Sequence, residues 1–196
     1  MSGRAELVRL NLQVAVDAAL GLPAAAEFAV WANAAAAAMQ PGWSKSRWLA
    51  VRLIDAAEST QYNQQYRGKT GPTNVLAFPV ADHLTAQQPD EPELGDLLIC
   101  WPVVQAEAAA QGKPVVAHLA HLTVHGVLHL LGHDHQELAA AATMEALETR
   151  IMRDLDFADP YSDAEATRVR PHMPAARDYD RRPNGEPAAG RIRSHE

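Results

Sequence analysis

The sequence predicts a small domain that combines about five helices with four short strands. Its 196 residues are 47% hydrophobic, which is enough apolar side chain for one buried core. Apolar residues recur at three- and four-residue spacing in several segments, as in helices. Short apolar runs bounded by glycine or proline lie between these segments, as expected of strands. We therefore expect a single folded domain over residues 1–166.

The N-terminal part predicts a strand, a helix and a second strand. Leucine and valine alternate with polar residues over 10–14, which is typical of a strand with one buried face. The alanine-rich segment 23–39 predicts a helix, because a Pro-Gly pair follows where a helix should end. The apolar run 48–54 predicts the second strand.

The next predicted elements place an arginine at a helix end. Asp55 is followed three residues later by a glutamate, a pattern that caps a helix expected over 56–66. Gly68 predicts the end of this helix, so Arg67 should lie at its C-terminal end. After a polar loop, the short apolar run 75–78 predicts a third strand.

The second half of the chain predicts one more strand and three helices. A polar, proline-bearing insertion at 81–93 is expected to be a mobile surface loop. It precedes a strand at 97–100 and a helix from 102 to about 111. A histidine-rich helix at 115–131 and an amphipathic helix at 136–155 complete the domain.

The histidine-rich segment carries the clearest chemical signal, because six of the nine histidines fall within 118–135. His125 and His129 are one helical turn apart and should point the same way. Gly132 lets the chain fold back after the helix, so His135 can return to the same point. Three neutral nitrogen ligands with a fourth position left open are typical of a catalytic zinc site. The sequence thus predicts a metal site at the C-terminal end of this helix.

Other polar residues near these histidines have structural interpretations. His118 and His121 lie on the same stripe, and we interpret both as core histidines whose nitrogens are hydrogen-bonded. His133 is offset from the triad and is expected to line a pocket or contact substrate. Glu145 and Glu148, near the apolar stripe of the last helix, are interpreted as solvated or capping carboxylates.

The same spacing also fits the H-x-x-x-H-x-x-G-x-x-H frame of the metzincin proteases. In that frame the residue after the first histidine is the glutamate that acts as general base. Here that residue is Gly126. Peptide hydrolysis by the usual metzincin route is therefore disfavoured.

Charge and cysteine content restrict the partners and the compartment. From Arg168 onward there are seven arginines and four acidic residues, a net charge of +3, which leaves −10 for residues 1–167 out of the total of −7. An acidic body is a poor general nucleic-acid binder, so RNA binding would need a local basic patch. The Arg/Pro-rich tail at 167–196 is expected to be disordered. The single cysteine, Cys100, and the lack of a long apolar run near the N-terminus predict a cytoplasmic protein.

Four blocks of the sequence form a recognisable pattern when taken together. In chain order they are NQQYRGKTGPTNVLAFP, LGDLLIC, HGVLHLLGHDH and MEALETRIMRDLDFADPY. This pattern resembles the YbeY family, bacterial metal-dependent endoribonucleases implicated in ribosomal RNA maturation. The resemblance covers about residues 7–161, and the histidine block is a specific part of it.

The resemblance implies an α+β fold, a small mixed sheet packed against helices, with one zinc ion held by His125, His129 and His135. It also implies that Arg67, in the block YRGK, is catalytic. The implied activity is cleavage of single-stranded RNA at the 3′ end of small-subunit ribosomal RNA and in ribosome quality control. Expected partners are ribosomal RNA, the small ribosomal subunit and ribosome-assembly proteins, with no DNA and no membrane.

The expected chemistry uses the metal and the arginine, and leaves the general base open. A bound dication activates water and polarises a phosphoryl oxygen, while Arg67 would stabilise charge on the non-bridging oxygens. Without the family, Arg67 could equally be a helix-end residue that binds the last carbonyl groups. The base could be Asp134, His133 or a substrate phosphate, and three imidazoles suit zinc, nickel, copper or iron. The alternative functions are another zinc hydrolase and a ribosome-associated binding factor with a structural zinc.

Overall fold

The structure, a computed structural model, describes residues 6–17, 21–39, 42–80, 92–133 and 138–162. Its elements, in chain order, are β1 (Val8–Val14), α1 (Ala25–Met39), β2 (Arg47–Ile54), α2 (Ala56–Arg67), β3 (Val75–Pro79), β4 (Glu93–Cys100), α4 (Trp101–Ala110), α5 (Val115–Leu130) and α6 (Leu138–Asp154). The four predicted strands and five predicted helices are all present. The predicted tail at 167–196 and most of the predicted loop at 81–93 lie outside the described residues.

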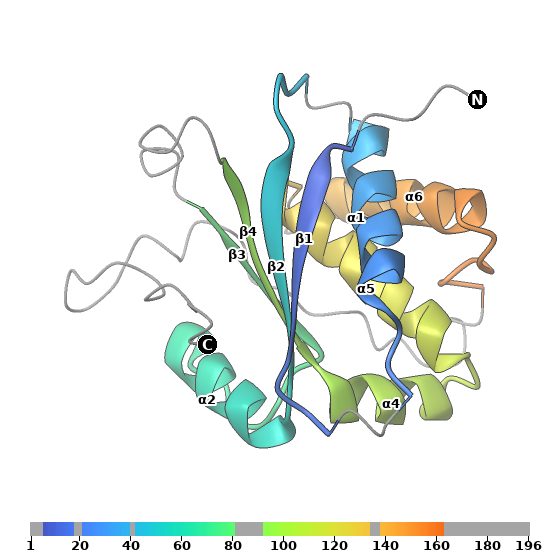
Figure 1. Cartoon of the computed structure of the whole chain (residues 1–196). Helices are drawn as coiled ribbons and strands as arrows, with labels where there is room; N and C mark the ends of the chain where they lie inside the picture. The colour runs from blue at the N-terminus through green and yellow to red at the C-terminus, as the bar shows by residue number, and fades with distance from the viewer. Residues whose placement is uncertain (1–5, 18–20, 40–41, 81–91, 134–137, 163–196) are drawn as a thin grey trace.

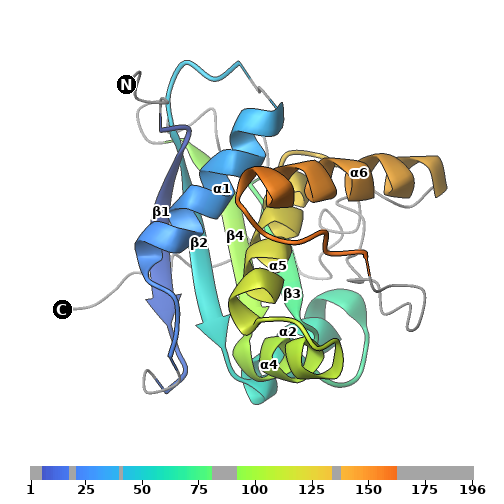
Figure 2. The ribbon, with the colours of Figure 1, turned by 90° about the vertical axis from the view of Figure 1, so that its right-hand side faces the viewer.

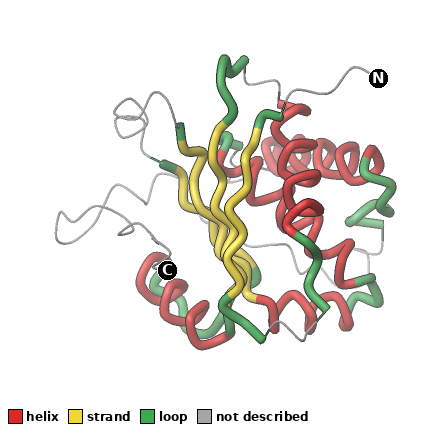
Figure 3. The backbone as a smooth tube through the Cα atoms, in the orientation of Figure 1, coloured by secondary structure: helices red, strands yellow, loops and turns green. Residues whose placement is uncertain are grey.

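The strands form one mixed sheet in the order β1-β2-β4-β3. β1, β2 and β4 are parallel to one another, and β3 runs antiparallel to β4. Figure 3 shows the strands side by side with helices on either side of them. The α+β fold with a small mixed sheet is thus confirmed. Every helix of the described ranges is too short or too polar to span a membrane.

β4 is longer than the sequence predicts, since it begins at Glu93 and the prediction begins at residue 97. The reason is Gly95, which interrupts the apolar run that signals a strand. Gly95 has a φ of 144°, and a Cβ added there would lie 2.4 Å from the carbonyl oxygen of Phe78 on β3. Only glycine fits so close to the neighbouring strand, and pairing with β2 is irregular at this point. A residue that looks like a strand breaker is therefore part of the strand.

The helices cover the two faces of the sheet unequally. α1, α5 and α6 lie on one face and α2 packs on the other (Figures 1 and 2). The main core, between the sheet and the first group, includes Phe28, Trp31, Leu49, Leu97 and Leu128. A smaller cluster under α2 consists of Ile54, Leu76, Leu98 and Cys100. The sheet thus separates α5 from α2.

α5 is the central helix of the main layer and packs against β3, β4, α1, α4 and α6. Every side chain from His118 to Leu130 is buried. Its approach to the sheet is closest at Gly126, where an added Cβ would lie 2.7 Å from Cδ2 of Leu97 on β4. Since Leu97 is itself fully buried, this position has no room for a side chain.

The ends of α2 follow the predicted caps. Asp55 Oδ1 accepts a hydrogen bond from the Glu58 backbone N–H at 2.8 Å, and Gly68 ends the helix in the left-handed conformation with φ 63°. The Glu58 carboxylate pairs with Arg52 on β2 at 3.0 Å. Gly68 ends the helix directly after Arg67, which thus lies at the C-terminal end of α2 as predicted.

Candidate metal centre and its buried histidine network

His125 and His129 lie together on one side of α5, as their spacing predicts. Both side chains are buried, and their ring centroids are 4.6 Å apart with the ring planes at 77°. His135 lies outside the described residues, as does Asp134, so the third predicted ligand is untested. Among the described residues there is no cluster of three His, Cys, Asp or Glu side chains able to hold a metal. The structure therefore supplies two members of the predicted triad.

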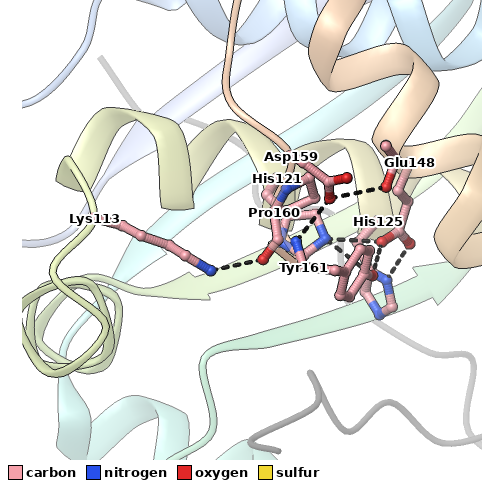
Figure 4. Close-up of polar contacts among 8 residues, drawn as sticks. Lys113, His121, His125, Glu148, Asp159, Pro160 and Tyr161 are labelled. Atoms are coloured by element: carbon pink, nitrogen blue, oxygen red, sulfur yellow. Dashed lines mark hydrogen bonds and ion pairs between the residues drawn. The ribbon is translucent and has the colours of Figure 1, made fainter. Parts of the chain in front are cut away.

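Glu148 of α6 holds the ring of His125. Its Oε1 is 2.6 Å from His125 Nδ1, and its Oε2 is 2.8 Å from His121 Nε2 (Figure 4). The side chain is fully buried, so its interpretation as a solvated or capping carboxylate is wrong. Glu148 lies on the same stripe of α6 as Met144 and Ile151, which pack in the main core. That position was a usable signal, because a carboxylate on a buried stripe needs a partner.

The neighbours of Glu148 favour its ionised form. Burial by itself raises the pKa of this carboxyl group. Attraction to His125 and hydrogen bonds with His121 and His125 outweigh burial, so the pKa of Glu148 lies well below its usual range. A fixed negative charge thus sits directly behind the His125 ring, which favours a cation on the ring's other side.

The remaining α5 histidines are core residues with hydrogen-bonded nitrogens, as predicted. His121 bonds Glu148, and His118 Nε2 is 2.7 Å from Glu107 Oε2 of α4. The Glu107 carboxylate also accepts from Asn74 Nδ2 at 3.1 and 3.2 Å, which ties α4 to the residue preceding β3. This second group is a link between elements.

His133 follows α5 and lies beside α1. Its Nε2 is 2.9 Å from Sδ of Met39, the last residue of α1. The ring is half-buried. A contact with substrate stays a prediction for His133.

The donor set suits a divalent metal such as zinc. When a carboxylate accepts a hydrogen bond from the Nδ1–H of a neutral histidine, the free lone pair of that ring is on Nε2. This is the usual arrangement of a metal-binding histidine. His125 has this arrangement, with His129 beside it on the same side of the helix. The residues present therefore fit the predicted ion, with His135 as the ligand still to be tested.

Arg67 comes from the other layer of the fold. It is the last residue of α2, is half-buried, and its Nη1 donates to Thr73 Oγ1 at 3.4 Å, just before the edge strand β3. α2 and α5 lie on opposite faces of the sheet (Figure 1). The structure thus brings His125 and His129 together, whereas a common site for them and Arg67 stays a prediction.

Gly126 also explains why this site is unlike a metzincin protease site. Position 126 faces the Leu97 side chain of β4, which occupies the place of any Cβ. A glutamate there would have to displace a fully buried leucine. The packing thus agrees with the sequence in excluding a general base at this position.

Comparisons with known proteins agree with the resemblance noted in the sequence. A family model described as "Endoribonuclease YbeY" matches residues 23–156. A curated protein from Alkalilimnicola ehrlichii, "Endoribonuclease YbeY", is 51% identical over 152 residues, covering 78% of this chain and 90% of the relative. A Thermotoga maritima protein solved in solution aligns with a TM-score of 0.48 and 17% identity, covering 83% of this chain and 99% of that one.

Proposed function

The chain belongs to the YbeY endoribonuclease family, and from this premise we propose that it is a metal-dependent endoribonuclease that cleaves single-stranded RNA during ribosomal RNA maturation. The observation that carries the proposal is the pair His125 and His129, with Nδ1 of His125 held by the buried carboxylate of Glu148. A histidine whose Nδ1 is bonded to a carboxylate, with a second histidine one helical turn away, is a common arrangement of metal ligands.

The residues that would hold the ion are His125, His129 and His135. When bound, the ion polarises a phosphoryl oxygen and lowers the pKa of a water molecule to about 7. Glu148 fixes the tautomer and direction of His125, and the buried surroundings of α5 limit access of bulk water. His125, His129 and Glu148 are all buried.

Arg67 is the proposed electrostatic catalyst. Its planar guanidinium can donate two hydrogen bonds to the non-bridging oxygens of a phosphodiester, where negative charge grows during cleavage. Its position at the end of α2, with a hydrogen bond to Thr73, limits its freedom before substrate arrives. Lower mobility reduces the entropy lost when it engages the phosphate.

Surroundings of Arg67 supply features suited to single-stranded RNA. Tyr66 and Phe78 meet edge to face with centroids 5.1 Å apart, and Tyr62 stacks on Tyr66 at 6.0 Å. Lys69 follows in the loop and is exposed. Aromatic rings beside cationic side chains can stack unpaired bases while the cations bind phosphates. This local basic and aromatic surface would offset the acidic body of the protein.

The same proposal includes the RNA substrate, the protein partners and the cellular compartment. We propose ribosomal RNA of the small subunit as substrate, with ribosome-assembly proteins as partners and a role in ribosome quality control. A cytoplasmic location would suit these partners. The free thiol Cys100 is buried and its pKa is raised by burial, so it stays reduced and unreactive there.

The test compares two buried histidines of the same helix. Purified wild type, His129→Ala and His118→Ala are analysed for metal content and for cleavage of a fluorescent single-stranded oligoribonucleotide. His129→Ala should lose both, because two ligands are too few for a stable zinc site. His118→Ala should retain the metal, since His118 bonds Glu107. Stoichiometric metal in His129→Ala would refute the site, and a metal-loaded wild type that never cleaves RNA would favour a binding factor with a structural zinc.

A further inference from the structure

The chain folds back after α6 and carries Tyr161 into the histidine network. Phe157 N–H bonds the Met152 carbonyl oxygen at 2.9 Å, and Asp156 turns the chain with a φ of 61°. We call residues 155–162 the return segment. Phe157 meets Trp31 of α1 edge to face at 6.3 Å, so the return segment packs on the core.

Polar contacts fix the end of the return segment. Lys113 Nζ donates to the Pro160 carbonyl oxygen at 2.6 Å, and Asp159 Oδ1 accepts from the Tyr161 backbone N–H at 2.9 Å. Thr149 of α6 donates to the same Asp159 oxygen at 3.2 Å. Figure 4 shows these contacts leading to Tyr161 beside His121, His125 and Glu148. Several independent contacts therefore hold Tyr161 in place.

The hydroxyl of Tyr161 donates to Glu148 Oε2, the same oxygen that bonds His121. The Tyr161 ring also meets the His121 ring edge to face, with centroids 5.3 Å apart. The carboxylate thus has three donors on two oxygens: Tyr161 and His121 on Oε2, and His125 on Oε1. Because Oε2 accepts two hydrogen bonds, the carboxylate cannot rotate without losing both of them. Oε1 therefore stays directed at His125.

We propose that Tyr161 and Glu148 are positioning residues that hold His125 as its Nδ1–H tautomer and so direct Nε2 of that ring to the metal. The inference rests on the metal site proposed above. It assigns opposite tautomers to His125 and His121, which lie on neighbouring turns of α5. Because both rings face a carboxylate acceptor, His125 carries its proton on Nδ1 and His121 carries its proton on Nε2.

The proposed metal ligands and Arg67 do not include Tyr161, so this inference adds a residue to the proposed site. A purely structural tyrosine would act through its ring, which Tyr161→Phe preserves. A positioning tyrosine acts through its hydroxyl, which the same change removes. The two roles therefore differ in one variant.

The first readout is the tautomer of each ring in metal-free protein. Long-range ¹H–¹⁵N spectra of histidine-labelled apoprotein distinguish Nδ1–H from Nε2–H rings. Wild type should have His125 as Nδ1–H and His121 as Nε2–H, and Tyr161→Phe should leave His125 as a mixture of tautomers. A wild-type His125 protonated on Nε2, or an unchanged tautomer in Tyr161→Phe, would overturn the proposal.

The second readout is Zn²⁺ affinity, measured by competition with a chromophoric chelator. Tyr161→Phe and Glu148→Gln should weaken Zn²⁺ binding by about 10- to 100-fold, as loss of a group that orients a metal ligand usually does. Tyr62→Phe is the matched control. Tyr62 lies on α2 across the sheet, so this variant should bind Zn²⁺ like wild type. Unchanged affinity in Tyr161→Phe would contradict the proposal even if Glu148→Gln fails to fold.

Failure of the proposed function would appear differently. If wild type bound no Zn²⁺ and cleaved no RNA, the metal site would be wrong and with it the purpose of the positioning. The tautomers of apoprotein would then decide alone whether Tyr161 orders His125. A fixed Nδ1–H tautomer that is lost in Tyr161→Phe supports the positioning in either case.

Discussion

Replacement of Gly126 by alanine tests the closest contact between α5 and the sheet. The added Cβ would lie 2.7 Å from Cδ2 and 3.1 Å from Cδ1 of Leu97, a fully buried side chain. Alanine gains up to about 1 kcal/mol over glycine in a helix interior, whereas overpacking a core costs about 1–3 kcal/mol. We therefore expect Gly126→Ala to lower the free energy of unfolding by about 0–2 kcal/mol. For a chain of this size this is a drop of up to about 8 °C in Tm.

A double-mutant cycle separates the clash from the helix propensity. Leu97→Ala alone should cost about 2–5 kcal/mol because it leaves a cavity. With that cavity present, Gly126→Ala should become neutral or stabilising, so the coupling between the two sites is about 1–3 kcal/mol. Ala146→Gly, at an exposed position of α6, measures the propensity term alone. Urea unfolding that finds Gly126→Ala more stable than wild type by about 1 kcal/mol would refute the close packing.

Three further predictions concern separate parts of the chain. Burial raises the pKa of Asp96 to about 6, and the nearby Glu93 adds to the effect. The folded state therefore binds this proton more tightly than the unfolded chain does. As a result, the free energy of unfolding falls as the pH rises from about 4 to 6. Asp96→Asn should remove that fall and gain up to about 3 kcal/mol at pH 7; equal urea midpoints for both proteins at pH 4 and pH 7 would contradict this. Arg67→Lys keeps the charge but loses the planar fork, so single-turnover RNA cleavage should fall by about 100-fold while metal content and Tm stay nearly constant, and near-normal cleavage would remove Arg67 from the mechanism. Deletion of residues 167–196 should leave Tm unchanged and weaken RNA binding at most in a salt-dependent way; a much lower Tm would mean that the tail packs on the core.

Local patterns predicted most of the fold. The cap at Asp55, the stop at Gly68 and the helical spacing of α5 each depend on neighbours within one or two turns, and all three agree with the structure. β4 was the exception. Its bulge requires Gly95 because of the carbonyl oxygen of Phe78, a neighbour that lies on another strand and that no local pattern reveals.

In the candidate site too, local relations could be predicted from the sequence and long-range ones could not. One helical turn fixes the relation of His125 to His129, so the sequence predicted that pair. The partner of His125 is 23 residues away in the chain, and the phenol that supports this partner is a further 13 residues along. The place of Glu148 on a buried stripe of α6 indicated that its carboxylate needs a partner, but no local pattern indicates which polar groups other elements bring to it.

Zn²⁺ titration tests directly whether the histidine pair on α5 binds the ion that cleavage needs. Metal-free protein is titrated with Zn²⁺ while the single-turnover rate of single-stranded RNA cleavage is followed in the same sample. We expect no cleavage without metal, a rise in rate that ends at one equivalent of Zn²⁺ per chain, and no rise in His129→Ala. Full cleavage by the metal-free protein, or an equal rise in His129→Ala, would contradict this expectation.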